Sequence, residues 1–341
     1  MNRLFSTLSL LSALTLSPAA AAPDLAVATR VPVSVFNFYE ENDVLTGTDQ
    51  YYTQGLKFSL LHVEEGTPAW LETLAGRLWT FLGNEKLEKV HNAGWTLGQN
   101  MYTGEDINRA TIDPDDRPWA GWLYAGRLLQ ITTRCNEKDR KCRAQQHTLE
   151  LDLGVVGPAS GAEWAQTKLH EVIESPEPAG WGNQLGNEPG VLLLYKGKWR
   201  FPRGSESFDL IPHGGFALGN VLAYLSVGGT VRLGRHLSGF GTETIPAADT
   251  KERHPWEAYV FGGVDGRLTA VNIFLDGNHF RDSHSVEKER FVHDLSYGAA
   301  VRFRQLRITY TIIRRAPEFE PRSGRDLDPQ NFGAVAISWE R

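Results

Sequence analysis

Apolar and polar residues alternate along much of this chain, and this pattern limits its fold more than any other property. After residue 22, no apolar run approaches the roughly 18 residues that a membrane-spanning helix needs. Apolar residues instead recur at every second position, most clearly in segments 52–60, 147–155, 221–233 and 334–339. Because neighbouring residues of a strand point to opposite faces, each segment would form a strand with one apolar face. The sequence therefore predicts an all-β protein.

A soluble β-sandwich and a transmembrane β-barrel both produce this alternation, but two observations favour the barrel. The polar faces carry charged side chains that suit a polar barrel interior: Lys57, Glu150, Asp152 and Arg232. Aromatic residues also lie near expected strand ends, where membrane barrels have aromatic girdles: Trp95, Tyr102, Trp119, Trp122, Tyr124, Trp256 and Tyr259. We therefore expect a transmembrane antiparallel β-barrel that segment 334–339 closes.

Two segments have helical rather than alternating patterns. The first covers residues 67–82, between a Thr-Pro start and a glycine stop. The second begins at Ser160, which would form a capping box with Glu163. Its apolar residues share one face, and His170 lies on the opposite, polar face. The sequence thus predicts short helices in the loops of the barrel.

The amino terminus has the pattern of an export signal. Arg3 is followed by an apolar stretch and then by four alanines at 19–22. We predict that residues 1–21 are a cleaved signal peptide and that residues 22–341 form a single barrel domain. An uncleaved membrane anchor is the alternative, but the run is short and Pro18 interrupts it. Removing the signal changes the formal net charge from −6 to −7 because only Arg3 is lost, and this charge disfavours nucleic-acid binding.

The only two cysteines are consistent with export. Cys135 and Cys142 are separated by six mostly charged residues, in a stretch typical of a hairpin tip. A disulfide across this tip would form in an oxidising compartment. A two-cysteine metal site is the alternative, although no partnering Cys or His cluster lies nearby in the sequence.

Common catalytic signatures are absent from the sequence. It has no G-x-S-x-G elbow, no Walker loop, no H-E-x-x-H motif and no dinucleotide fingerprint. One segment is distinctive, and it covers residues 41–55 with the sequence ENDVLTGTDQYYTQG.

This segment resembles the amino-terminal pattern of the outer-membrane lipid A 3′-O-deacylases, which has Asn-Asp, a spacer containing Asp, and then Tyr-Thr-x-Gly. The similarity continues in order along almost the whole mature chain. The further matching pieces are 98–103, 116–122, 153–158, His170, 181–184, 219–221, 272–278 and 280–283.

The resemblance implies an antiparallel barrel of about twelve strands in the bacterial outer membrane. It also implies calcium-dependent hydrolysis of the ester that holds the 3′ acyloxyacyl chain of lipid A, the membrane anchor of lipopolysaccharide. Matched by position, the active-site residues of the family fall on Asn42, Asp43, Thr53, His170 and Arg109. We expect lipid A as the substrate and a monomer as the active form.

These residue types suit ester hydrolysis. A neutral imidazole, here His170, can accept a proton from water near neutral pH. Calcium prefers hard oxygen ligands, which Asp43 and Asn42 can supply. Arg109 would share the developing negative charge or bind a lipid phosphate, and Thr53 would orient water or substrate.

Each of these residues also has a simpler interpretation. Asn42 and Asp43 are common turn formers, and both can serve one site only where the strand is irregular. Thr53 would satisfy a neighbouring polar group, His170 would be a solvated surface residue, and Arg109 an ordinary loop charge.

Two other functions remain open at this point. One is an outer-membrane esterase of different specificity, such as a phospholipase. The other is a non-catalytic barrel or pore, which would not need a histidine on a loop helix beside an Asn-Asp strand.

Overall fold

The structure is a computed structural model that describes residues 34–43, 52–63, 89–133, 144–202, 205–241 and 254–341, together with residues 69, 73, 76 and 77. The predicted signal peptide, both cysteines and nearly all of the predicted helix at 67–82 lie outside the described residues. Those predictions are therefore untested. No helix in the described ranges has the length and apolar character needed to cross a membrane.

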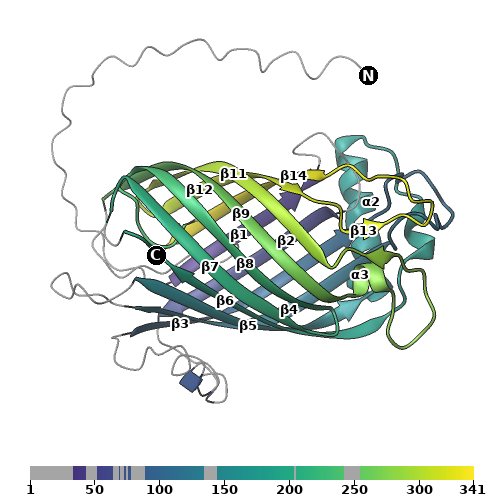
Figure 1. Cartoon of the computed structure of the whole chain (residues 1–341), viewed down its shortest axis with the longest axis horizontal. Coiled ribbons are helices and arrows are strands. Elements are labelled where there is room, and N and C mark those ends of the chain that lie inside the picture. The colour runs from purple at the N-terminus through teal and green to yellow at the C-terminus, as the bar shows by residue number, and fades with distance from the viewer. Residues whose placement is uncertain are drawn as a thin grey trace, which may run out of the picture.

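Twelve strands form one closed antiparallel barrel (Figure 1). The strands are β1 (Ser34–Asn42), β2 (Tyr52–Val63), β3 (Lys89–Tyr102), β4 (Ala120–Thr133), β5 (Gln145–Val156), β6 (Glu188–Trp199), β7 (Phe208–Gly219), β8 (Leu222–Arg235), β9 (Trp256–Asn272), β11 (Phe291–Phe303), β12 (Leu306–Arg315) and β14 (Gln330–Glu340). Strand β14 pairs with both β12 and β1, so the last segment closes the barrel as predicted. The predicted fold is confirmed.

The connections contain short elements. These are η2 (Pro158–Ser160), α2 (Ala162–Ile173), η3 (Gly180–Asn183), α3 (Ile273–Asp276), β10 (Glu287–Lys288) and β13 (Phe319–Glu320). Strands β10 and β13 pair with each other outside the barrel. The predicted second helix exists as α2, but its amino-terminal cap is Gly161 and no side chain caps it, so the predicted capping box at Ser160 is wrong.

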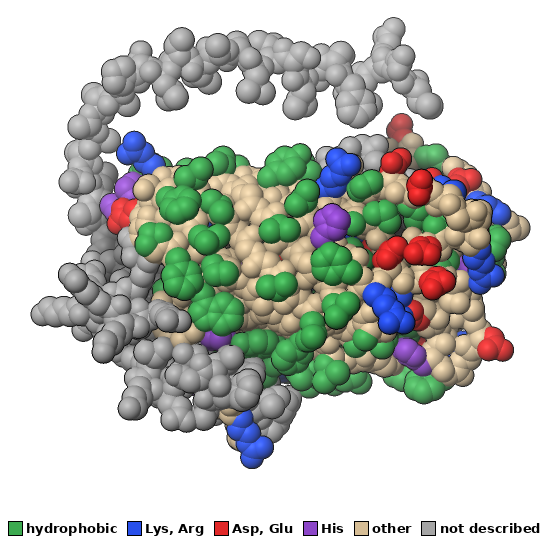
Figure 2. Space-filling model, viewed as in Figure 1, with side chains coloured by type: hydrophobic (Ala, Val, Ile, Leu, Met, Phe, Trp, Pro, Cys, Tyr) green, Lys and Arg blue, Asp and Glu red, His purple; other side chains and the backbone are tan. Residues whose placement is uncertain are grey.

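Apolar side chains cover the outer wall of the barrel (Figure 2). In β8, for example, Leu225 and Val227 are 62% and 69% exposed, and Val231 and Leu233 continue this face. A soluble protein would bury such a surface, whereas lipid tails solvate it. The wall therefore supports the barrel over the sandwich.

The interior of the barrel holds the charged side chains, as predicted. Lys57, Glu150, Asp152 and Arg232 are all buried. The Lys57 ammonium nitrogen lies 2.7 Å from a Glu150 carboxylate oxygen, and a terminal nitrogen of Arg232 lies 2.6 Å from a carboxylate oxygen of Asp209. Pairing offsets the cost of removing these charges from bulk water.

The expectation that seven aromatic residues form girdles is wrong for five of them. Trp95 and Trp256 are exposed on the wall, but the other five are buried: Tyr102, Trp119, Trp122, Tyr124 and Tyr259. Tyr102 stacks on Phe274 of α3 with ring centroids 4.0 Å apart. Tyr102, Trp122 and Tyr124 thus pack in the barrel with Phe274 instead of facing the membrane interface.

The two ends of the barrel differ in their connections. The end with α2, α3 and β13 carries the long described connections 103–119, 157–187, 273–290 and 316–329 (Figure 1). The opposite end carries the C-terminus and the short connection 304–305, and also the connections 64–88, 134–144, 200–207 and 236–255, which the structure describes only in part. Membrane barrels of this class place their longer loops outside the cell, and the longest connection, 157–187, lies at the end with α2. We call that end the outer rim and the opposite end the inner rim.

Candidate active site

Three of the predicted site residues lie together at the outer rim. Asn42 is the last residue of β1 and pairs with Gln54 of β2 and with Gly333 of β14. Asp43 follows directly after the strand and is fully buried. The regular alternation of side chains stops between Asn42 and Asp43, because the strand ends at Asn42. The backbone is therefore irregular at this point, and both side chains can serve one site.

Thr53 occupies a second irregular position. The register between β2 and β3 shifts between Tyr52 and Gln54, which leaves Thr53 in a bulge. Its hydroxyl oxygen lies 2.6 Å from that of Thr103, and both residues are buried. Two strand irregularities thus gather buried Asn, Asp and Thr side chains at adjacent strand ends.

The helix that carries His170 packs on the outside of the barrel wall. Met101 of β3 has the same parity as Trp95 and Leu97, which are 59% and 51% exposed on the outer face. It forms an apolar cluster with Ala162 of α2 and with Trp119 and Trp181. Helix α2 therefore covers the wall near the outer rim instead of reaching into the barrel.

A glycine permits this close approach. A Cβ added at Gly121 of β4 would overlap Ser160 Oγ and Ala162 Cβ. Gln99 of β3 also donates its side-chain amide to the backbone oxygen of Ser160 at 2.6 Å. Both contacts fix the start of α2 against β3 and β4.

His170 lies on the face of α2 that is turned inward. The buried residues of the helix are Ala162, Gln166 and His170, whereas Val172 is 80% exposed. The simpler interpretation of His170 as a solvated surface residue is therefore wrong. The polar face of α2 can be buried because other residues supply its hydrogen bonds. For example, the Trp181 indole nitrogen donates to Gln166 Oε1 at 2.7 Å.

The ring of His170 has a defined hydrogen bond. Its Nδ1 lies 2.6 Å from the backbone oxygen of Pro176. Because a carbonyl oxygen only accepts, Nδ1 must carry the proton. In the neutral ring, Nε2 then keeps its lone pair and can act as a base.

The strand register shows how far the end of β1, with Asn42 and Asp43, lies from helix α2. Asn42 pairs with Gln54, and Gln54 pairs with Met101, so these residues form one row across β1, β2 and β3. Neighbouring strands are about 4.8 Å apart, which places Asn42 about 10 Å from Met101. Helix α2 thus covers the wall two strands away from the Asn-Asp pair, at the same rim.

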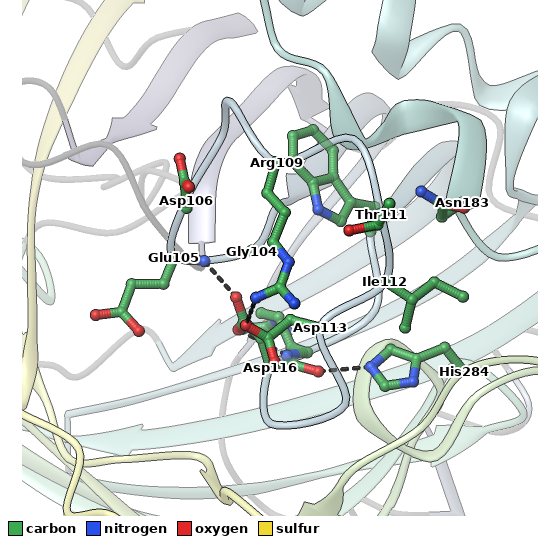
Figure 3. A pocket seen from close by; sticks show the side chains of 12 residues that line it. Gly104, Glu105, Asp106, Arg109, Thr111, Ile112, Asp113, Asp116, Asn183 and His284 are labelled. Atoms are coloured by element: carbon green, nitrogen blue, oxygen red, sulfur yellow. Dashed lines mark hydrogen bonds and ion pairs between the residues drawn. The ribbon is translucent and has the colours of Figure 1, made fainter.

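Arg109 lies in the β3–β4 connection beside the segment that follows α2. The Asn183 side chain donates to the Ala110 oxygen at 2.8 Å and joins these two segments. The Arg109 guanidinium pairs with Asp113, and both line a pocket of about 220 Å³ (Figure 3). The structure therefore places Arg109 beside the segment that follows α2, in a pocket that Asn183 also lines.

Asp116 and His284 form the floor of that pocket (Figure 3). Asp116 accepts the backbone N–H of Glu105 at 2.5 Å, and its backbone oxygen lies 2.6 Å from His284 Nε2. Burial raises the pKa of the Asp116 carboxyl, although two backbone N–H donors and Arg117 oppose this. This pocket was not predicted as a site, although 116–122 is one of the matching segments.

Sequence comparison places these features in a known family. The family model described as outer membrane protein LpxR matches residues 7–341, nearly the entire chain. The chain belongs to this family. It is therefore a protein of the bacterial outer membrane, as predicted.

One solved structure supports the fold. LpxR from Salmonella typhimurium superimposes with a TM-score of 0.67 at 19% sequence identity, over 90% of this chain and all of that one. The β-domain of the Bordetella autotransporter BrkA gives a TM-score of 0.42 at 11% identity, over 91% of this chain and 99% of that one. The sequence matches none of the curated proteins compared with it.

Proposed function

We propose that this protein is a lipid A 3′-O-deacylase that uses calcium and a histidine base. The observation that carries the proposal is the position of His170, buried on a helix that covers the outer wall at the outer rim. Lipid A is confined to the outer leaflet, so its ester bonds lie at this level of the wall. The family membership supports the same function.

The residues at the end of β1 fit a calcium ion. Asp43 offers a carboxylate and Asn42 offers an uncharged amide oxygen, and both residues are buried. Hard oxygen ligands of this kind suit calcium better than a transition metal. Bound there, calcium would supply positive charge that stabilises the negative charge of the ester oxygen in the transition state.

His170 performs the proton transfer in this proposal. Its Nε2 accepts a proton from a water molecule as the water oxygen bonds to the ester carbonyl carbon. When the bond from that carbon to the sugar oxygen breaks, the proton passes to the departing hydroxyl. The products are the free acyloxyacyl acid and lipid A with a 3′ hydroxyl group. The bond to Pro176 keeps a proton on Nδ1, so Nε2 is the nitrogen that accepts the proton from water and then releases it to the sugar oxygen.

Thr53 and Arg109 have positioning roles in the proposal. The Thr53 hydroxyl, held by Thr103, orients the water or the substrate carbonyl. Arg109 exchanges its partner Asp113 for a phosphate of lipid A, because guanidinium groups bind phosphate in the same bidentate way as carboxylate.

Mass spectrometry of lipid A tests this function in cells. Cells that express the protein should contain lipid A that lacks one acyloxyacyl unit, and cells without it should not. Hydrolysis of phospholipid with intact lipid A would instead show an esterase of the other specificity. No change in either lipid would favour a non-catalytic barrel.

A further inference from the structure

A cluster of two histidines and a glutamate lies at the inner rim, at the opposite end of the barrel from the proposed active site. Glu206 precedes β7, His236 follows β8 and His254 precedes β9. One ligand atom from each of the three residues lies within 4.8 Å of the other two. The cluster thus joins two connections on the periplasmic side.

The distances are close to those of a metal site. Glu206 Oε2 lies 3.5 Å from His236 Nδ1 and 3.6 Å from His254 Nε2. Tetrahedral zinc ligands at about 2.0–2.1 Å from the metal are about 3.3–3.4 Å from one another. The two distances from the Glu206 oxygen to the histidine nitrogens therefore need to shorten by only a few tenths of an ångström.

The two imidazole rings lie against each other beside the carboxylate, with centroids 3.7 Å apart and planes 26° from parallel. A metal ion lies in the plane of each ring that binds it, so metal binding would turn at least one ring until its nitrogen points to the ion.

The backbone holds the cluster in place. His236 has a φ of 57°, a left-handed conformation that non-glycine residues rarely adopt and that is often found at functional sites. Its ring also packs edge-on against Trp256 at 4.5 Å. The backbone oxygen of Glu206 accepts the N–H of Leu237 at 2.9 Å, which fixes the glutamate beside the histidine.

We propose that Glu206, His236 and His254 bind a divalent transition metal of the zinc class at the inner rim. Two imidazoles and one carboxylate match the ligands of such ions and not those of calcium. A water molecule would take the fourth position. The metal would link the connection before β7 to the connection between β8 and β9. This site would be separate from the proposed active site at the outer rim.

Zinc titration of the full chain tests the proposal. The protein is purified in detergent without a histidine tag, and Zn²⁺ is added near pH 7.5 in the presence of excess Ca²⁺. We expect one equivalent of Zn²⁺ to bind, and Co²⁺ in its place to give the visible spectrum of a tetrahedral site. His254→Ala should weaken Zn²⁺ binding at least about 10–100-fold, the loss that even an outer-shell partner causes.

Two further variants make the result decisive. His236→Asn removes the second imidazole, and asparagine tolerates a positive φ, so the backbone should keep its conformation. His279→Asn is the control, because His279 lies in a connection at the outer rim. Equal Zn²⁺ affinity in wild type, His254→Ala and His236→Asn would overturn the proposal. A loss of Zn²⁺ affinity in His279→Asn as large as in these two variants would also overturn it. Deacylation in excess Ca²⁺ should be unchanged in His254→Ala, so this test is independent of the proposed activity.

Discussion

His170 donates the proton on Nδ1 to the backbone oxygen of Pro176 across 2.6 Å. This bond connects the helix α2 to the segment that follows it and sets which ring nitrogen can act as a base. It also explains how a histidine on the polar side of a loop helix is buried without losing its hydrogen bond.

Replacing His170 with asparagine should remove the base and keep the fold. The asparagine amide can still donate to Pro176, so α2 should stay in place. Turnover on lipid A should fall by a factor on the order of 10²–10⁴, as expected for a lost general base. Steady-state kinetics measures this effect, and the gel mobility of unheated protein checks that the barrel is intact. Activity equal to wild type would place the base elsewhere.

Replacing Asp43 with asparagine should change the response to calcium. The substitution keeps the shape of this buried side chain but removes the charge that attracts the ion. The Ca²⁺ concentration for half-maximal activity should rise on the order of 10–100-fold, because the number of charged ligands tunes calcium affinity. Glu171→Gln is the control, an exposed carboxylate on α2 that pairs only with Lys168 among the described contacts. An unchanged calcium titration in Asp43→Asn would remove Asp43 from the metal site.

Gly121 should be essential for placing α2 on the wall. Gly121→Ala would force a Cβ against Ser160 and Ala162 and push the helix outward. Because small displacements of catalytic groups reduce rates strongly, activity should fall about tenfold or more. Gly182→Ala is the matched control, since a Cβ there meets nothing within 4 Å. Equal activity of both variants would show that the contact does not position His170.

The outer rim should loosen in acid through Glu318. Burial alone would raise the pKa of this carboxyl, but Arg315, Arg117 and Arg267 outweigh burial and hold the pKa below its usual value. The ionised form therefore stabilises the fold above about pH 4.3, and this stability is lost as the pH falls through the lowered pKa.

Hydrogen exchange between about pH 5 and pH 3 measures this loosening. In wild type, protection of residues 316–320 should decrease on acidification, whereas Glu318→Gln should be less protected at pH 5 and change little. Glu320→Gln alters an exposed neighbour and should behave as wild type. A pH dependence in Glu318→Gln equal to that of wild type would exclude Glu318 as its cause.

The alternation of residues predicted the strands and their two faces, and the charged side chains on the polar faces favoured a barrel over a sandwich. Leu225 and Val227 face outward while Lys57 and Glu150 face inward, because lipid outside and paired charges inside both follow strand periodicity. The closing strand followed from the same rule. Local sequence therefore determined which residues face lipid.

The packing of the loops could not be predicted in this way. Trp122 and Tyr102 are on the inward faces of their strands, but they are buried because Phe274 from a distant connection packs with them. The buried face of α2 is polar at Gln166 because Trp181, fifteen residues later, supplies its partner. Strand positions depend on local periodicity, whereas these contacts depend on which loops meet at the rim.

The central claim is that this protein hydrolyses the 3′ ester of lipid A with calcium at the outer rim. Mass spectrometry of purified lipid A after incubation with the purified protein tests it most directly. With Ca²⁺, wild type should release the intact acyloxyacyl acid and leave a 3′ hydroxyl, and neither chelator-treated wild type nor His170→Asn should do so at a comparable rate. Loss of a chain from another position, or equal release in strong chelator, would contradict the account.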